Sequence, residues 1–275
     1  MDIERLAAFT QGEDGGNPAG VVICDTLPDE AVMQQIARDV GYSETVFASR
    51  QGSHWRTRYF APAKEIPFCG HATIALGAAL ADKYGDNSYL LRLNDGEVSV
   101  YGKGQPTLSA SLEAPISSNR SPEGQYLEQC LALFSYSEAD LDTRITPAII
   151  NAGANHLLIA LNSRERLREM AYDLEVGRAL MAKENLATIS LVFAETNALF
   201  HARNPFAAGG VYEDPATGAA AAALGGYLRA IGWPHSGSVK ILQGEDMGVP
   251  TNIFVELPEE HDARIKVFGT VRRIL

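Results

Sequence analysis

The most informative stretch of the chain is Pro67-Phe68-Cys69-Gly70-His71-Ala72-Thr73, which leads into the apolar run Ile74-Ala75-Leu76-Gly77-Ala78-Ala79-Leu80-Ala81. A second stretch, Tyr212-Glu213-Asp214-Pro215-Ala216-Thr217-Gly218, leads into a similar run of Ala, Gly and Leu. Both runs are apolar nearly all round, which predicts buried helices rather than surface helices. We expect these helices at 71–84 and 214–231. Their similar openings, His-Ala-Thr and Asp-Pro-Ala-Thr, indicate a duplicated unit.

Strand-like segments flank both expected helices, which suggests a sheet wrapped around each. The expected strands are 3–9, 19–24, 45–48, 55–60, 89–93, 97–101 and 107–112, then 148–151, 156–161, 188–194 and 198–202. A surface helix is expected at 28–40, where Val32, Ile36 and Val40 recur at four-residue spacing. Two more helices are expected, at 123–134 and 173–183.

The predicted fold class is α+β, with two pseudo-symmetric domains that each curl a mostly antiparallel sheet around a buried central helix. The 275 residues lie near the upper limit for one hydrophobic core. We expect one domain at 1–115 and another at 116–262, with a last strand at about 263–275 returning to the first. The stretch 115–122, rich in Ser and Pro, is the predicted linker.

Composition argues against several classes of function. The formal net charge of −11 gives no general attraction for nucleic acid or anionic membrane surfaces. The three cysteines have no CxxC spacing, and the six histidines have no metal-ligand spacing, so neither a disulfide framework nor a metal site is expected. The N-terminus lacks an apolar signal core, and no apolar run approaches the ~20 residues of a membrane span. These features predict a cytoplasmic protein.

The starts of the two buried helices are the best candidate binding sites. A helix N-terminus presents unpaired N–H groups and a partial positive charge, so it can hold a carboxylate despite the acidic chain. His71 at such a start is expected to stay neutral. Taken singly, the polar residues have ordinary interpretations: Asp214 as a helix N-cap before Pro215, Glu44 as a solvated carboxylate, and Cys69 as a packed thiol.

Taken together, six blocks in this order resemble the PhzF-like family, which is named for an isomerase of phenazine biosynthesis. The blocks are Gly16-Asn17-Pro18-Ala19-Gly20-Val21-Val22, Ser43-Glu44-Thr45-Val46-Phe47, Arg58-Tyr59-Phe60-Ala61-Pro62, Glu65-Ile66-Pro67-Phe68-Cys69-Gly70-His71-Ala72-Thr73, Glu213-Asp214-Pro215-Ala216-Thr217-Gly218, and Gln243-Gly244 with Met247-Gly248. The resemblance runs from about Phe9 to the final strand.

The resemblance implies the diaminopimelate-epimerase-like fold, an active site between its two domains, and usually a homodimer. It also implies cofactor-free isomerisation of a small carboxylate substrate, with no metal. By position, Glu44 matches the carboxylate that moves a proton between two substrate carbons, and His71 and Asp214 match its partners. The substrate-binding residues implied are Asn17, Ser43, Gly70, Ala72, Thr217, Gly218 and Ala219.

Three departures from the family pattern leave the substrate open. Ala219 and Ala220 follow Gly218 where the family commonly has Ser. Val249-Pro250-Thr251 stands in place of Arg-Pro-Ser. Arg203-Asn204-Pro205-Phe206 replaces Arg-x-Phe-x-Pro.

Two other functions fit parts of the sequence. The first is a two-cysteine racemase or epimerase, in which Cys69 beside a helix start would be one base. That mechanism needs a second thiol, and the corresponding place is expected to hold Asp214. The second is a protein that binds a small carboxylate without turning it over.

Overall fold

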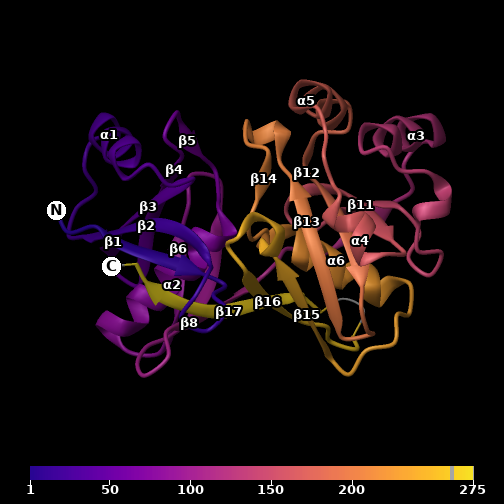
Figure 1. Cartoon of the computed structure of the whole chain (residues 1–275). Helices are drawn as coiled ribbons and strands as arrows, with labels where there is room; N and C mark the ends of the chain where they lie inside the picture. The colour runs from indigo at the N-terminus through magenta and orange to yellow at the C-terminus, as the bar shows by residue number, and fades with distance from the viewer. Residues whose placement is uncertain (261–262, 275) are drawn as a thin grey trace. The chain divides into compact units, whose positions relative to one another are not determined.

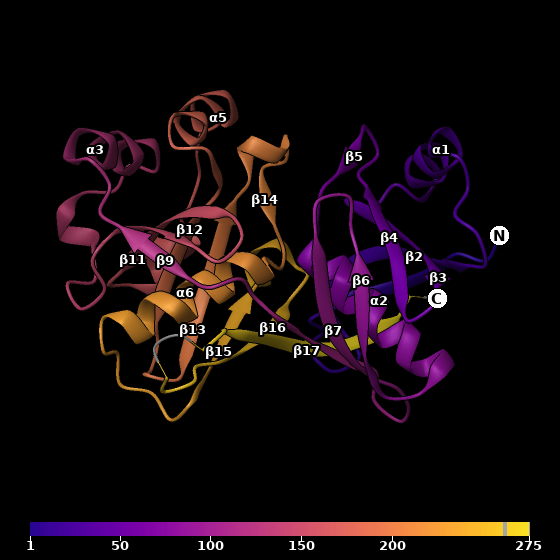
Figure 2. The same cartoon turned by 180° about the vertical axis from the view of Figure 1, so that it is seen from behind.

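A computed structural model of the chain describes residues 1–260 and 263–274 (Figures 1 and 2). These residues form two units, the first made of 1–113 and 268–274 and the second of 114–267. The chain enters the second unit after Glu113 and returns to the first within strand β17 (Lys266–Arg273).

In the first unit a sheet closes on itself around one helix. Its strands are β1 (Glu4–Ala8), β2 (Asn17–Cys24), β3 (Glu44–Gln51), β4 (His54–Phe60), β6 (Asn87–Arg92), β7 (Glu97–Lys103) and β8 (Ser109–Glu113). They pair in the order β17-β1-β2-β3-β4-β6-β7-β8, and β8 pairs again with β17. The helix inside is α2 (Gly70–Tyr84), with strands of its unit in front of it in both views (Figures 1 and 2).

The small residues of α2 let the helix lie close to the sheet. Every side chain from His71 to Ala81 is buried, as the apolar pattern predicted. A Cβ atom at Gly77 would lie 2.5 Å from a methyl group of Val100 on β7, so only glycine fits there. The closed sheet therefore depends on the Ala and Gly content of this helix.

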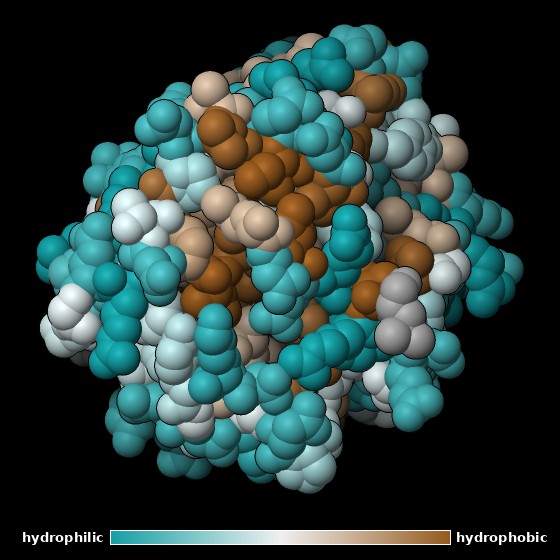
Figure 3. Space-filling model, turned by 90° about the vertical axis from the view of Figure 1, so that its left-hand side faces the viewer, coloured by the Kyte–Doolittle hydropathy of each residue, from teal (hydrophilic) through white to brown (hydrophobic). Residues whose placement is uncertain are grey.

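Helix α1 (Glu30–Val40) packs on the outside of the first sheet through Met33 and Ala37, both buried. Of the expected apolar stripe, Ile36 packs against the same cluster, whereas Val32 is 47% exposed. Met33 and Ala37 are also four residues apart, so the four-residue spacing alone did not show which face of the helix is buried. Figure 3 shows apolar side chains gathered among polar ones on the side where this unit lies in Figure 1.

The second unit has the same plan, a sheet packed against one buried central helix. Its strands are β9 (Ser118–Arg120), β10 (Ala148–Asn151), β11 (Asn155–Leu161), β12 (Leu186–Ala194), β13 (Leu199–Pro205), β15 (Ser238–Gln243) and β16 (Thr251–Glu256), paired in that order. Helix α6 (Gly218–Ala230) packs on this sheet and is buried from Ala220 to Leu228. The stretch 115–122 is not simply a linker, because β9 lies within it and pairs with β10.

Three helices contribute to a separate apolar cluster of the second unit. They are α3 (Gly124–Leu133), α4 (Arg164–Arg168) and α5 (Leu174–Lys183). Their buried side chains, among them Cys130, Leu167 and Met181, pack with residues of β10, β11 and β12.

The two units repeat one pattern, which confirms the duplicated unit. In each, a short strand pairs antiparallel with the strand before it: β5 (Glu65–Ile66) with β4, and β14 (Glu213–Asp214) with β13. A helix then begins four residues after that short strand, at Gly70 in the first unit and Gly218 in the second. Each helix leads to a strand parallel to the one before the short strand.

This repeat corrects the register suggested by the shared Ala-Thr letters. Structurally, Cys69 corresponds to Thr217, Ile66 to Asp214, and His71 to Ala219. Thr73 lies within α2, whereas Thr217 precedes α6. The second central helix therefore begins at Gly218 and not at Asp214.

In the part of the chain that the structure describes, no helix has both the length and the apolar character needed to cross a bilayer.

Candidate active site

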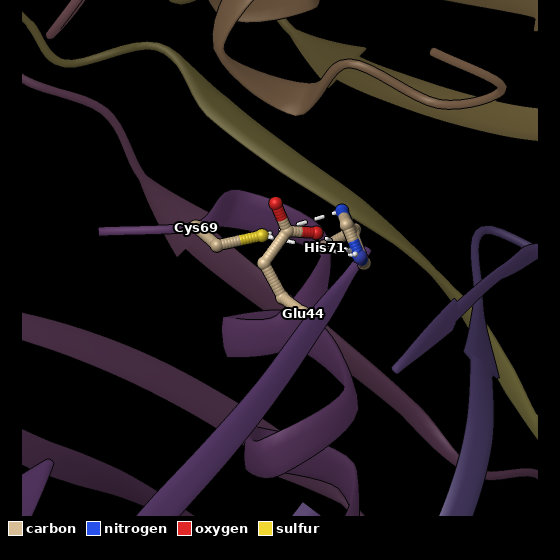
Figure 4. Close-up of side chains that lie close together, drawn as sticks. All are labelled: Glu44, Cys69 and His71. Atoms are coloured by element: carbon tan, nitrogen blue, oxygen red, sulfur yellow. Dashed lines mark hydrogen bonds and ion pairs between the residues drawn. The ribbon is translucent and has the colours of Figure 1, made fainter. Parts of the chain in front are cut away.

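Several polar side chains meet where α2 begins. Strands β2 and β3 are parallel, with Ala19 opposite Glu44, so their first residues Asn17 and Glu44 lie at the same end of the sheet. The chain enters α2 at that end, through Cys69 and His71 (Figure 4). Residues far apart in sequence are thus collected at one helix start.

Glu44 faces His71 at close range. Its Oε2 lies 3.2 Å from His71 Nε2, and its side chain is 13% exposed. The angles between the two groups are not those of a hydrogen bond. No other residue that the structure describes makes a hydrogen bond with Oε2, although this atom is buried. A buried carboxylate oxygen without such a partner is costly, and sites of this kind are often functional.

Asn17 sets the tautomer of His71. Its side-chain Nδ2 lies 3.2 Å from His71 Nδ1. Because Nδ2 can only donate, Nδ1 must accept, and the proton of the neutral ring is then on Nε2. Nε2, which carries that proton, lies 3.2 Å from Glu44 Oε2. Asn17 thus contacts His71 in this structure, and its contact with a substrate stays a prediction.

Cys69 also contacts the imidazole. Its Sγ lies 3.3 Å from His71 Nδ1 and 3.9 Å from Nε2. Thr73 Oγ1 donates to the Cys69 carbonyl at 2.7 Å, and Tyr59 on β4 donates to Thr73 Oγ1 at 2.7 Å. Burial raises the pKa of Tyr59, so its hydroxyl stays a donor. These bonds tie the start of α2 to the sheet.

The start of α6 is built differently, from hydrogen bonds within the second unit. Thr217 Oγ1 donates to Asp214 Oδ2 at 2.6 Å. Gln243 Nε2 donates to the Asp214 carbonyl at 2.6 Å and to Thr217 Oγ1 at 3.0 Å, while its Oε1 accepts from Thr217 N–H at 3.2 Å. Thr251 Oγ1 donates to the carbonyl of Pro215 at 3.0 Å. Gln243 thus holds both ends of the turn before the helix.

The interpretation of Asp214 as the helix N-cap is wrong. The N-cap of α6 is Thr217, and Asp214 lies in β14. The Asp-Pro pair suggested a helix start because Asp is a frequent cap, but the chain makes one more turn before the helix begins. A role for Asp214 in stability therefore depends on its bond with Thr217.

The other expected substrate-binding residues are distributed over both helix starts. Gly70 is partly exposed in the first turn of α2, Ala72 is buried, and Ser43 is exposed just before β3. Gly218 and Ala219 are partly exposed in the first turn of α6. Whether they contact a substrate stays a prediction. Gln243 was quoted in the family pattern but not as a site residue, and only its contacts with Thr217 and Asp214 reveal its role.

The model of the phenazine biosynthesis-like protein family, PhzC-PhzF, matches residues 6–272 of the chain. The chain belongs to the PhzC-PhzF family. An isomerase of Clostridium acetobutylicum, itself uncharacterised, is 29% identical, covering 98% of this chain and 94% of the relative. The trans-2,3-dihydro-3-hydroxyanthranilate isomerase of Pseudomonas fluorescens is 30% identical, covering 96% and 94%.

A solved PhzF-family structure from Bacillus anthracis has the same fold, with a TM-score of 0.85 and 23% identity over 99% of this chain and 96% of that one. The PhzC-PhzF relatives are named isomerases, and the chain is an isomerase of this type. The expected fold class and enzyme class are both confirmed.

Proposed function

We propose that the protein is a cofactor-independent isomerase that moves a proton between two carbons of a small carboxylate-bearing metabolite, with Glu44 as the base and then the acid. The observation that carries this proposal is the buried Glu44 Oε2, which makes no hydrogen bond with a residue in the described ranges and lies 3.2 Å from His71 Nε2. An oxygen without a hydrogen-bond partner can accept a proton from carbon without first breaking a hydrogen bond.

One group that both removes and returns the proton needs no external acid. A positioned general base contributes typically about 10²–10⁴-fold to a rate, so other groups must stabilise the negative charge that develops on the substrate. The first N–H groups of α2, at Gly70, His71 and Ala72, are suited to a carboxylate or an enolate oxygen. The Nε2–H of His71 is a further donor beside Glu44.

We assign to Asp214 the role of the second partner of Glu44, beside His71. The N–H groups of Gly218 and Ala219 would be further donors to the substrate. The support for Asp214 is the family pattern together with the hydrogen bonds that hold Asp214 and Thr217 at the start of α6. An active site shared by the two domains stays a prediction, as do a homodimer and a cytoplasmic location. Ser43 and Thr217 stay predicted substrate contacts.

The substrate is proposed only as a class. The Pseudomonas fluorescens relative is named for trans-2,3-dihydro-3-hydroxyanthranilate, a compound that carries a carboxylate. This chain has Ala219 where the family commonly has Ser after the glycine, so a hydroxyl donor is missing. We therefore expect a small carboxylate whose recognition depends more on backbone N–H groups than on that hydroxyl.

A two-cysteine racemase is less well supported. The residue that corresponds to Cys69 in the repeat is Thr217, which has no thiol. Cys130 lies in the apolar cluster of the second unit, where burial raises its pKa to about 11. Burial also raises the pKa of Cys24. Neither thiol is prepared to act as a base.

The experiment that tests the proposal is deuterium uptake from D₂O into a panel of small amino, hydroxy and unsaturated carboxylates, followed by mass spectrometry. Glu44→Gln keeps the shape of the side chain, so we expect at least a hundredfold loss of exchange with an unchanged circular dichroism spectrum. Glu65→Gln, which alters a carboxylate on the same unit away from this cluster, is the matched control and should retain exchange. Equal uptake in wild type and Glu44→Gln would assign the base role to another group.

Exchange that a thiol reagent abolishes in wild type but not in Cys69→Ser would favour the cysteine mechanism instead. A ligand from the panel that binds tightly and takes up no deuterium would favour a carboxylate-binding protein without turnover.

A further inference from the structure

The three side chains at the start of α2 have the chemistry of a transition-metal site. Glu44, Cys69 and His71 each offer one ligand atom, and these atoms all lie within 4.8 Å of one another (Figure 4). The sequence predicted no metal site because Glu44 is distant in the chain from Cys69 and His71. The closed sheet places Glu44 beside them.

Their separations are close to those of a tetrahedral zinc site. Zn–N and Zn–O bonds of about 2.0 Å and Zn–S bonds of about 2.3 Å place neighbouring ligand atoms roughly 3.3–3.6 Å apart. Here Glu44 Oε2 lies 3.2 Å from His71 Nε2, and Cys69 Sγ lies 3.9 Å from the same nitrogen. All three ligand atoms lie within 4.8 Å of one another, so the side chains must rotate to bind a common ion. The buried Oε2, which makes no hydrogen bond with a described residue, would gain a bond to the ion.

We propose that Glu44, Cys69 and His71 bind Zn²⁺, and that the bound ion inhibits the isomerase. The inhibition rests on the proposed function, because the ion would occupy the Glu44 oxygen that accepts the proton; the binding site itself does not. Three protein ligands leave a fourth position for water or a substrate carboxylate. When the Zn–S bond forms, the Cys69 thiol releases its proton to solvent, and nothing is oxidised or reduced.

Charge also favours this assignment. A cation at the start of α2 meets a partial positive charge of about half an elementary unit. The Glu44 carboxylate and the Cys69 thiolate together bring two full negative charges, which outweigh it. The mixture of thiolate, imidazole and carboxylate favours Zn²⁺ or Co²⁺ over Mg²⁺, which prefers oxygen ligands alone.

The metal-bound state requires the opposite tautomer of His71. Nε2 must then offer its lone pair, so the proton moves to Nδ1, and Asn17 must accept a hydrogen bond rather than donate one. A half-turn of the Asn17 amide places Oδ1 in the position now held by Nδ2. Asn17 is therefore suited to either state of the ring, in the way that outer residues support metal-bound histidines.

The test is a titration of the purified full chain with Co²⁺, which reports a thiolate ligand through a charge-transfer band in the near ultraviolet. We expect one equivalent to produce the band, Zn²⁺ to remove it by displacing Co²⁺, and Mg²⁺ to have no effect. Cys69→Ser should abolish the band, and Cys24→Ser, the matched control, should retain it. Absence of the band in wild type, or its persistence in folded Cys69→Ser, would overturn the site.

Asn17→Asp tests the tautomer that we assign to His71 in the metal-bound state. A carboxylate can only accept from Nδ1–H, so we expect Zn²⁺ affinity to rise at least tenfold, measured by competition with a chromophoric chelator. Weaker binding in folded Asn17→Asp would contradict the assigned tautomer. For the inhibitory role, Zn²⁺ should suppress deuterium exchange and EDTA should restore it, whereas stimulation by Zn²⁺ would overturn inhibition. A cobalt band in a protein that exchanges no deuterium would retain the site and reject the proposed function.

Discussion

The two central helices occupy equivalent places in a duplicated unit, yet their starts differ in chemistry. At α2 the residues Cys69 and His71 lie beside Glu44, one of whose buried oxygens makes no hydrogen bond with any residue that the structure describes. At α6 the equivalent positions are Thr217 and Ala219, and Gln243 bonds Thr217 and the Asp214 carbonyl. Duplication thus produced one helix start with a thiol and an imidazole beside Glu44, and one with a turn in which Gln243 and Thr217 are hydrogen-bonded.

The two units also differ in the burial of an equivalent ion pair. In each unit this ion pair joins the short strand before the central helix to the strand that precedes it. Arg58 on β4 pairs with Glu65 on β5, and Arg203 on β13 pairs with Glu213 on β14. The side chains of the first pair are 17% and 21% exposed, whereas those of the second are 9% and 3% exposed. A buried charge that loses its partner costs far more than an exposed one.

The largest expected effect on stability is therefore that of Glu213→Ala. It should lower the free energy of unfolding by about 3–5 kcal/mol, because Arg203 would stay buried without its carboxylate. Glu65→Ala, at the equivalent position, should cost less, about 1 kcal/mol, because Arg58 is more exposed than Arg203 and keeps Glu30 as a partner. Urea denaturation of both variants measures the difference. Equal losses would mean that the two starts are supported alike.

A second test concerns Asp214. Asp214→Asn keeps an oxygen that can accept from Thr217 Oγ1 but cannot exchange a proton at neutral pH. We expect about a 10–100-fold loss of deuterium exchange, with a change in unfolding free energy below about 1 kcal/mol. Thr217→Val, which removes the donor and keeps Asp214, measures how much of the loss comes from the broken hydrogen bond. Full activity in Asp214→Asn would leave the start of α6 with a structural role alone.

Gln243 stabilises the turn before α6 through its hydrogen bonds with Thr217 and the Asp214 carbonyl. Gln243→Ala would leave the Asp214 carbonyl and the Thr217 N–H without this partner, so we expect a loss of about 1–3 kcal/mol in unfolding free energy. Gln243→Glu keeps the acceptor and loses the donor, and its loss should be intermediate. Hydrogen exchange at Thr217 and Gly218 should rise in the Ala variant. No change in that exchange would show that other bonds hold the turn.

The smallest expected effect is a loss of unfolding free energy at low pH that arises from His156. This histidine is buried on β11, its Nδ1 bonds Thr188 Oγ1 at 2.7 Å, and Thr188 donates to Asn204. Nδ1 therefore carries the proton, and the buried Nε2 has no partner among the described residues. Burial lowers the pKa of His156 from 6.5 to about 4.

Between pH 6.5 and about 4 the unfolded chain binds a proton at His156 that the folded chain does not. The contribution of this group is therefore complete above about pH 6.5 and is lost as the pH falls toward 4. We expect a loss of about 1–2 kcal/mol between pH 6.5 and 5. A flat NMR titration of the His156 ring from pH 7 to 5 would support the lowered pKa, and an ordinary titration near pH 6.5 would contradict it.

Patterns within short segments were predicted well. The two buried helices and the strands expected between residues 3 and 202 follow from apolar runs and turn residues, whereas β15 and β16 were not predicted. Errors occurred where two local interpretations were equally good. Val32 and Met33 both belong to four-residue apolar spacings in α1, and Asp214-Pro215 resembles a helix start although the chain first forms β14.

The sequence by itself determined the family, the duplicated plan and the identity of the polar residues, because these depend on residue order and local periodicity. Only the tertiary structure decided what those residues contact. Parallel pairing of β2 and β3 and the closed sheet bring Asn17, Glu44 and Cys69 around His71, and the β13–β14 turn brings Gln243 to Thr217. Such contacts depend on strand register and packing across distant segments, which no local pattern encodes.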